Sequence, residues 1–192
     1  NDAVYALAVA QGKLFAGGLF TQAEGAPADH LAAFDGSAWS AVGGSIDGTV
    51  FALGTLQDNL YAGGRFGTAG GTAAANIARW DGTAWSPLGA GVSVAAAYAP
   101  AEVRTLLADS GFLYVGGMFD HAGPLSVLSI ARFDGSAWSA SGAGIYHRQC
   151  IRYTCHNHPY RCRALARSGG LLYAVVNPTT GDDPMVYSST PG

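Results

Sequence analysis

The segment from Tyr146 to Cys162 carries the side chains best suited to chemistry. It reads YHRQCIRYTCHNHPYRC and holds all three cysteines of the chain, together with three histidines and three arginines. Thiolate and imidazole groups bind zinc and copper, and arginine binds anionic groups through paired hydrogen bonds. The segment therefore predicts one of three features: a disulfide, a metal site or a ligand-binding loop.

The first alternative is a disulfide among Cys150, Cys155 and Cys162. An odd number of cysteines leaves one disulfide and one spare thiol, or a bridge to another chain. One disulfide would close a short loop and order this long connecting segment. The pairing stays open.

The second alternative is a zinc or copper site at Cys155, His156 and His158. The cysteines are separated by four and six residues, which matches no standard zinc-binding spacing. The expectation is therefore that the protein has no cofactor, with zinc or copper as the alternative.

The third alternative is a loop that binds a protein or a glycan. Arginine supplies paired donors and tyrosine supplies stacking faces. A second loop, residues 120–129, is predicted on the same face and carries an Asp-His pair, as does loop 21–30 with Asp29 and His30. These pairs could join a metal site or act as acid and base. The candidate binding residues are Tyr146, His147, Arg148, Arg152, Tyr153, Asp120 and His121.

An internal repeat sets the framework for these loops. Residues 4–46 align without gaps on residues 50–92, with 19 of 43 positions identical, and residues 103–145 form a third copy. A fourth copy begins at Cys162. Repeats of this length indicate stacked units, each of one small sheet.

Each copy is expected to form four antiparallel strands. In the first copy they are predicted at residues 4–9, 13–16, 31–34 and 38–42. Asp-Gly pairs at 35–36, 81–82 and 134–135 predict type I′ turns between the last two strands. The Gly-Gly pair at 17–18 and its copies indicate close backbone approach. The recurring aromatic residues are expected to pack adjacent units together.

The repeat units resemble the kelch-like blades of large secreted microbial proteins, and are similar to repeats of fungal cell-surface polarity proteins. The resemblance is carried by AGGRF at 62–66 and NIARWDGTAW at 76–85. It implies an all-β fold, a β-propeller of four-stranded antiparallel blades, in an extracellular or cell-surface protein. It implies no particular ligand.

The resemblance makes residues 1–192 a single propeller-type domain of about 3.7 blades. The blades are expected at residues 3–46, 49–92, 102–145 and 161–192, the last incomplete. The connectors between them lengthen along the chain, from 47–49 through 93–102 to 146–161. Since insertions in repeat proteins gather on the binding face, function is expected at these connectors.

Composition excludes several classes of protein. Apolar residues make up 49% and charged residues 12%, which excludes classical disorder. A net charge of −3 gives no basic surface for nucleic acid. The longest apolar run, residues 3–10, falls far short of the roughly 20 residues of a membrane-spanning helix. No nucleic acid and no membrane span are therefore expected.

The sequence favours a non-catalytic extracellular protein with a structural or interaction role. It has no nucleophile elbow of the Gly-x-Ser-x-Gly type and no repeat-breaking carboxylate pair, so no enzyme is expected, with a metal-dependent enzyme as the alternative. The incomplete fourth blade leaves several arrangements open: part of a larger propeller, an irregular four-blade ring, two copies completing one ring, or a head-to-tail fibre. The alternatives are a monomeric protein- or glycan-binding module and a metal-binding module.

Overall fold

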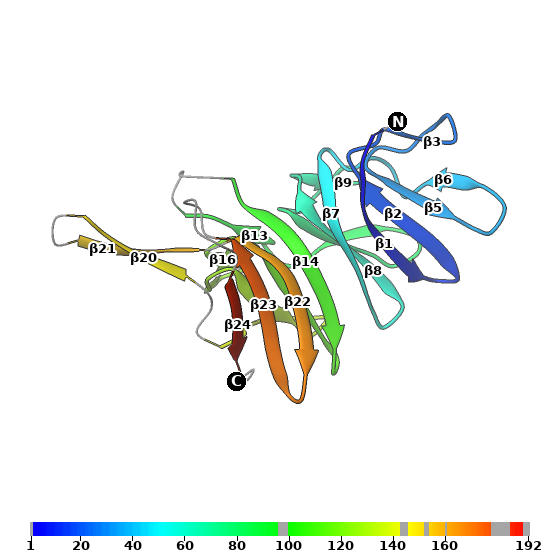
Figure 1. Ribbon diagram of the computed structural model, residues 1–192. Coiled ribbons are helices and arrows are strands. Elements are labelled where there is room, and N and C mark those ends of the chain that lie inside the picture. Colours follow the sequence, from blue (N-terminus) through cyan, green and yellow to red (C-terminus); the bar gives the residue numbers. More distant parts are fainter. Residues whose placement is uncertain are drawn as a thin grey trace. The chain divides into compact units, whose positions relative to one another are not determined.

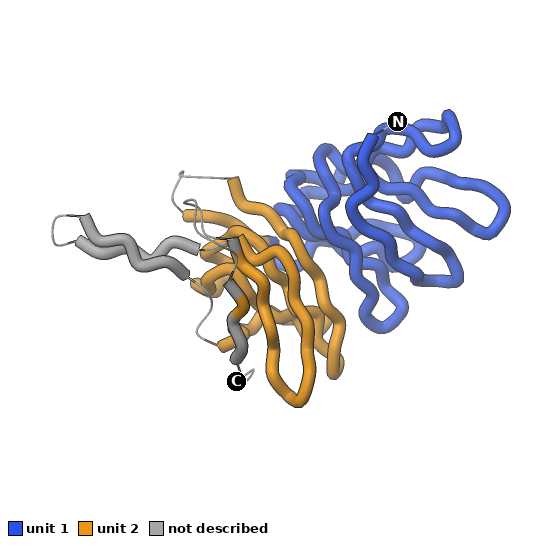
Figure 2. Tube along the Cα trace, in the orientation of Figure 1, with its two compact units in different colours: residues 1–91 blue, residues 92–192 orange. Residues whose placement is uncertain are grey.

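The computed structural model describes residues 2–95, 100–142, 146–151, 154–159, 161–177 and 185–189, and every element in them is a β-strand (Figure 1). For residues 146–151 and 154–159 the description is confined to the backbone. The prediction of an all-β fold is confirmed. The chain forms two compact units, residues 1–91 and 92–192 (Figure 2), where the sequence predicts one domain.

The first three repeats each form a four-stranded antiparallel sheet, with strands in chain order. Sheet 1 consists of β1 (Val4–Ala10), β2 (Lys13–Gly18), β5 (Leu31–Phe34) and β6 (Trp39–Ala41). Sheet 2 consists of β7 (Thr49–Leu56), β8 (Asn59–Arg65), β11 (Ile77–Trp80) and β12 (Trp85–Pro87). Sheet 3 consists of β14 (Glu102–Asp109), β15 (Phe112–Met118), β18 (Ile130–Phe133) and β19 (Trp138–Ala140).

The fourth repeat forms sheet 4. Its described strands are β22 (Arg161–Ser168), β23 (Leu171–Asn177) and β24 (Met185–Ser189). In all four sheets the first strand carries a β-bulge after its first or second residue, so residues at equivalent positions can be matched by register.

Short hairpins connect the second and third strands of sheets 1 to 3. They are β3 (Gln22–Ala23) with β4 (Ala26–Pro27), β9 (Thr68–Ala69) with β10 (Thr72–Ala73), and β16 (His121–Ala122) with β17 (Leu125–Ser126). In unit 2, β13 (Val92–Ser93) pairs with β16 and extends that hairpin to three strands. The connector after sheet 3 contains a further hairpin, β20 (Tyr146–Ile151) with β21 (Thr154–Pro159).

The Asp-Gly turns differ from the type I′ turns predicted. In the first turn only Gly36 has a positive φ, 101°, because Asp35 instead accepts hydrogen bonds from the backbone N–H groups of Ser37 and Ala38 at 2.9 and 3.0 Å. Four residues then separate the paired positions Phe34 and Trp39. Asp81 and Asp134 make the same contacts in sheets 2 and 3. The prediction of a two-residue turn was wrong because the carboxylate organises a wider loop.

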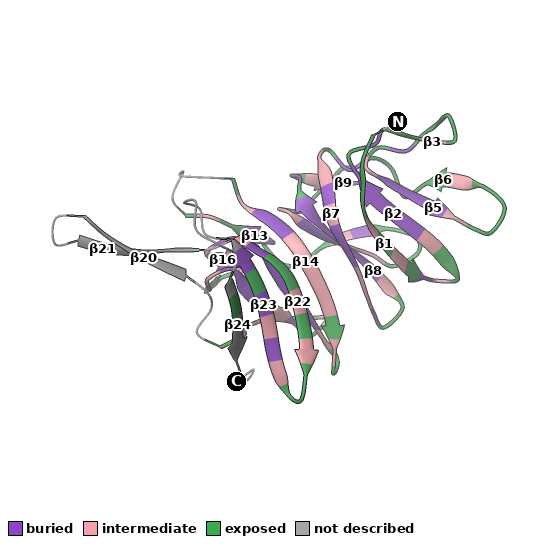
Figure 3. Cartoon of the chain, viewed as in Figure 1, coloured by how far each residue is buried: buried purple, intermediate pink, exposed green. Residues whose placement is uncertain are grey.

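The Gly-Gly pairs lie where sheets are most crowded, as predicted. A Cβ atom on Gly18, Gly64 or Gly117 would come within 2.0 to 2.1 Å of a carbonyl oxygen of the neighbouring first strand. The tryptophans take the packing role expected of them. Trp85 is buried, and its indole N–H donates to the carbonyl of Val42 at 3.2 Å. Figure 3 shows the second strand of sheet 2, β8, as largely buried.

Candidate functional site

The hairpin of β16 and β17 holds the candidate site in unit 2. Its ends are tied by two hydrogen bonds, from Gly117 N to Ser129 O at 3.0 Å and from Ser129 N to Phe119 O at 2.9 Å. Ser129 has a φ of 67°, and the residues at its position in sheets 1 and 2, His30 and Asn76, also have a positive φ and the same two bonds. The repeat therefore fixes the base of this loop while leaving its tip free to vary.

His30 belongs to this framework. Its Nδ1 lies 2.8 Å from the carbonyl oxygen of Ile46, which is buried beside it. The sequence raised Asp29 and His30 as an acid and base pair. The positive φ of His30 and its contact with the Ile46 carbonyl show a structural role for this residue in the loop of sheet 1.

Asp120 and His121 come together with a residue that the sequence did not indicate, Ser126. The carboxylate Oδ1 of Asp120 lies 2.6 Å from Nδ1 of His121, and the Ser126 hydroxyl lies 3.3 Å from Nε2 of the same ring. An ionised carboxylate only accepts, so Nδ1 donates to it; in the neutral ring Nε2 then accepts from Ser126. Asp120 also accepts from the backbone N–H of Ala95 at 2.9 Å, which orients the carboxylate.

These three residues border a cavity of about 280 Å³. The lining combines the polar groups of the trio with largely apolar residues. Val127 and Ile130 in its wall are buried, at 7% and 4% exposure. The lining residues are Asp120, His121, Ser126, Val127, Leu128, Ile130, Ala140 and Gly142. An apolar wall with a few convergent polar groups is the usual form of a small-molecule site.

The polar trio occurs in only one of the three equivalent hairpins. At its positions sheet 1 has Thr21, Gln22 and Pro27, and sheet 2 has Gly67, Thr68 and Ala73. The backbone is the same in all three, because the contact between positions 120 and 127 recurs as Ala28 N to Thr21 O and Ala74 N to Gly67 O. The trio is therefore not needed to build the hairpin.

One of the predicted connectors contacts the 120–129 loop in unit 2. The connector that contains β13 pairs with β16, so Val92 lies opposite Ala122 and Ser93 opposite His121. Ser93 O also accepts from Asp120 N at 3.0 Å. The connector that contains β13 and the 120–129 loop thus lie together at this end of sheet 3.

The other predicted binding residues can be placed only by backbone. Tyr146, His147 and Arg148 lie on β20, while Arg152 and Tyr153 lie outside the described residues. His156, His158 and Cys155 lie on β21, and their side chains are likewise outside the description. Among the side chains that the structure describes, no group of three His, Cys, Asp or Glu residues is placed to hold a metal ion. The zinc or copper site stays a prediction.

The cysteines separate into two kinds. Cys162 is a free thiol, fully buried on the first strand of sheet 4, and burial raises its pKa to about 12. It occupies the position of Val50 and Val103, so it packs as an apolar residue and is not a disulfide partner. Cys150 and Cys155 are paired positions of the hairpin of β20 and β21.

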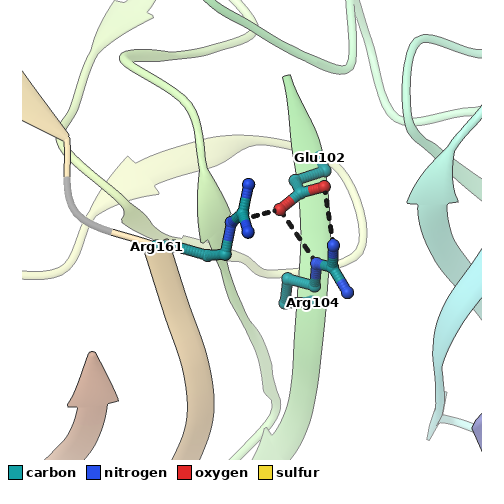
Figure 4. Close-up of polar contacts among 3 residues, drawn as sticks. All are labelled: Glu102, Arg104 and Arg161. Atoms are coloured by element: carbon teal, nitrogen blue, oxygen red, sulfur yellow. Dashed lines mark hydrogen bonds and ion pairs between the residues drawn. The ribbon is translucent and has the colours of Figure 1, made fainter. Parts of the chain in front are cut away.

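A buried ion cluster in unit 2 was not foreseen from the sequence. Glu102 is fully buried at the start of β14, with its two oxygens 2.9 and 3.0 Å from Nε and Nη2 of Arg104 (Figure 4). Nε of Arg161, on β22, lies 2.8 Å from the same carboxylate as an ion pair without hydrogen-bond alignment. Because the buried carboxylate of Glu102 on β14 meets Arg161 on β22, the cluster indicates a role in joining sheets 3 and 4.

No protein-family model and no curated protein matches the chain in sequence. In the described part of the chain, no helix is long and apolar enough to cross a membrane.

Proposed function

We propose that the protein is a non-catalytic extracellular interaction module built of kelch-like β-propeller blades, and that it binds a glycan through the cavity beside Asp120, His121 and Ser126. The single observation that carries this proposal is the polar trio that lines the cavity and is present in one of the three equivalent hairpins. Four-stranded antiparallel sheets in tandem support the blade architecture.

The chemistry of the cavity favours a neutral hydroxylated ligand. A carboxylate, an imidazole and a hydroxyl supply both acceptors and donors within a few ångströms of one another, as neighbouring sugar hydroxyls require. The apolar wall formed by Val127, Leu128 and Ile130 suits the C–H face of a sugar ring. Among the described lining residues none is a lysine or an arginine, so a phosphate or sulfate group finds no permanently cationic partner among them.

The test is a binding titration against a panel of neutral oligosaccharides, followed by calorimetry on the best of them. His121→Ala and Ser126→Ala should each weaken binding by about tenfold or more, since each removes a hydrogen bond worth about 1.4 kcal/mol or more. The matched control is Gln22→Ala, at the position of His121 in sheet 1. Equal sugar affinity of the His121 variant and the wild type would contradict the proposed binding site.

The order of the trio also supports a second candidate function, ester hydrolysis. Asp120 orients the His121 ring, and Nε2 of His121 faces the Ser126 hydroxyl, as in a nucleophilic serine site. A fluorophosphonate reagent distinguishes the two functions. A covalent adduct on Ser126 that is lost in His121→Ala would favour the hydrolase, whereas an unmodified protein that binds sugar favours the module.

A further inference from the structure

Three of the five histidines of the chain lie in the hairpin of β20 and β21. His147 is on β20, and His156 and His158 are on β21. The hairpin belongs to the connector between sheets 3 and 4 (Figure 1), whereas the two shorter connectors, residues 47–49 and 93–102, contain no histidine. The framework of the repeat therefore does not require these histidines.

The register of the hairpin brings the three histidines to one face. His147 is paired directly with His158, and Gln149 is paired with His156. Alternate residues of a strand share a face, and directly paired residues lie on the same face. A shift of the pairing by one residue would separate His147 from the other two histidines.

The spacing of these three positions follows from strand geometry. Directly opposite residues, as His147 and His158 are, have Cβ atoms about 4.5–5.5 Å apart. Diagonal neighbours, as His147 and His156 are, lie about 7–8 Å apart, which is still within reach of ring side chains. Residues two apart on one strand, as His156 and His158 are, lie roughly 7 Å apart. A triangle of this size allows three imidazoles to bind one metal ion.

We propose that His147, His156 and His158, brought to one face of the hairpin by its register, bind a zinc ion. Three histidines are a known ligand set for zinc, with a fourth position left open to water. Copper(II) also binds imidazole but prefers ligands in a square plane, so the triangular set favours zinc.

The opposite face of the hairpin carries the cysteines. Cys150 and Cys155, a directly paired couple, lie there together with Arg148. Arg148 is the one lysine or arginine among residues 146–151 and 154–159, so no such cation shares the histidine face in these ranges. In the proposed ligand set His147 therefore takes the place that the sequence analysis gave to Cys155.

A zinc ion at this site would also stabilise the hairpin. The strands β20 and β21 form a two-stranded sheet of their own, and an isolated pair of strands is only marginally stable in water. Ligands from both strands would hold the pair together, because the free energy of metal binding adds to that of folding. Hydrogen exchange of the backbone amides in both strands should therefore slow when zinc is added.

The test is calorimetry with zinc chloride on the full chain, together with hydrogen exchange. The wild type should bind one zinc ion per chain. His147→Ala should weaken binding by at least about tenfold, because even a change behind a metal ligand costs about 10- to 100-fold in affinity. Absence of zinc binding by the wild type, equal affinity of the variant, or binding without slower exchange in β20 and β21 overturns the site.

Two double variants restore a third histidine at different positions. H147A/Q149H places it on the same face, opposite His156, and should regain most of the lost affinity. H147A/R148H places it on the opposite face and should bind zinc as weakly as H147A does. Equal affinity of the two double variants would contradict the shared face.

A third variant, C150S/C155S, tests the cysteine thiolates as alternative ligands. It should bind zinc as tightly as the wild type, because both residues lie on the face without histidines. Loss of zinc binding in this variant, with its β-sheet circular dichroism unchanged, would assign the ion to the cysteines and overturn the histidine site.

Discussion

The two units join their paired sheets with the same backbone but with different chemistry. In unit 1 the residues just before Val4 and Val50 are Ala3 and Thr49, which are neutral; in unit 2 their equivalents are Glu102 and Arg161, which form an ion pair. At the far end of these strands, Gln11 donates its backbone N–H to the Asp58 carboxylate at 2.8 Å. Near the same end in unit 2, Asp109 and Arg167 form an ion pair at positions that Ala10 and Thr55 occupy in unit 1.

This difference teaches that the contact between two adjacent sheets needs glycine and an aliphatic side chain at its centre. The residues at the two ends of that contact are free to vary. Charges at both ends of the contact make sheets 3 and 4 selective for each other. If a neutral sheet took the place of sheet 4, the buried Glu102 would lose its contact with Arg161. A buried ion pair adds specificity more readily than stability. The predictions that follow test this contrast.

The largest effect is expected from Glu102→Ala. It leaves Arg104 and Arg161 without the carboxylate, and because their side chains are 23% and 34% exposed, the expected cost is about 3 kcal/mol, at the lower end of the range for a fully buried pair. Hydrogen exchange under increasing urea should show early opening of β14 and β22. The control is Thr49→Ala at the same position in unit 1, where a change below about 1 kcal/mol is expected. Similar losses of stability in both variants would contradict the proposed difference between the two units.

A smaller effect is expected from exchanging residues between sheets 1 and 4. Gly17→Val introduces the residue of sheet 4 where a Cβ atom would already meet Val50 at 2.5 Å. Overpacking of this kind costs about 1–3 kcal/mol. Val175→Gly, the reverse change on a partly exposed residue, should cost about 1 kcal/mol or less. Urea unfolding measures both, and equal costs would show that Val175 is packed as tightly as Gly17.

Cys162→Val should change stability still less. The substitution gives sheet 4 the residue that sheets 2 and 3 have at that position, and volume-conserving changes cost less than about 1.5 kcal/mol. Burial raises the pKa of this thiol to about 12. Alkylation of Cys162 at pH 8 should therefore require the contact between sheets 3 and 4 to open first. Rapid alkylation of the folded protein, located by peptide mass spectrometry, would contradict the burial of Cys162.

Local patterns predicted the sheets well because each signal acts within a few residues. Gly-Gly, the strand alternation and the recurring Trp-Ser pair fix strand positions in three copies. The type I′ prediction failed because it considered backbone preference at Asp35 and Gly36 without the hydrogen bonds of the Asp35 side chain.

The site was predicted less completely. Asp120 and His121 were found because they are adjacent in sequence, but Ser126 was missed because its proximity depends on the pairing of β16 with β17. The ion pair of Glu102 and Arg161 was missed for a similar reason. These residues lie far apart along the chain, and only the register of the bulged first strands reveals that they occupy one position in neighbouring sheets.

The smallest difference between the units should appear in acid. The Ser37 hydroxyl and nearby backbone N–H groups hold the pKa of Asp35 at about 2, below its ordinary 3.8, and the N–H groups of Ala84 and Thr83 do the same for Asp81. The pKa of Asp134 in unit 2 is lowered by the N–H groups of Ala137 and Ser136. Unit 1 therefore has two such turns, and the described part of unit 2 has one.

A folded-state pKa below the unfolded value stabilises the fold above about pH 4, and this contribution is lost as the pH falls toward about 2. Unit 1 should therefore lose more stability than unit 2 across this range. Asp35→Asn with Asp81→Asn should flatten the pH dependence of hydrogen exchange in unit 1 and leave that of unit 2 unchanged. Because these carboxylates are fully exposed, the effect should also be the one most reduced by added salt. An undiminished acid response in the double variant would assign the loss to other carboxylates.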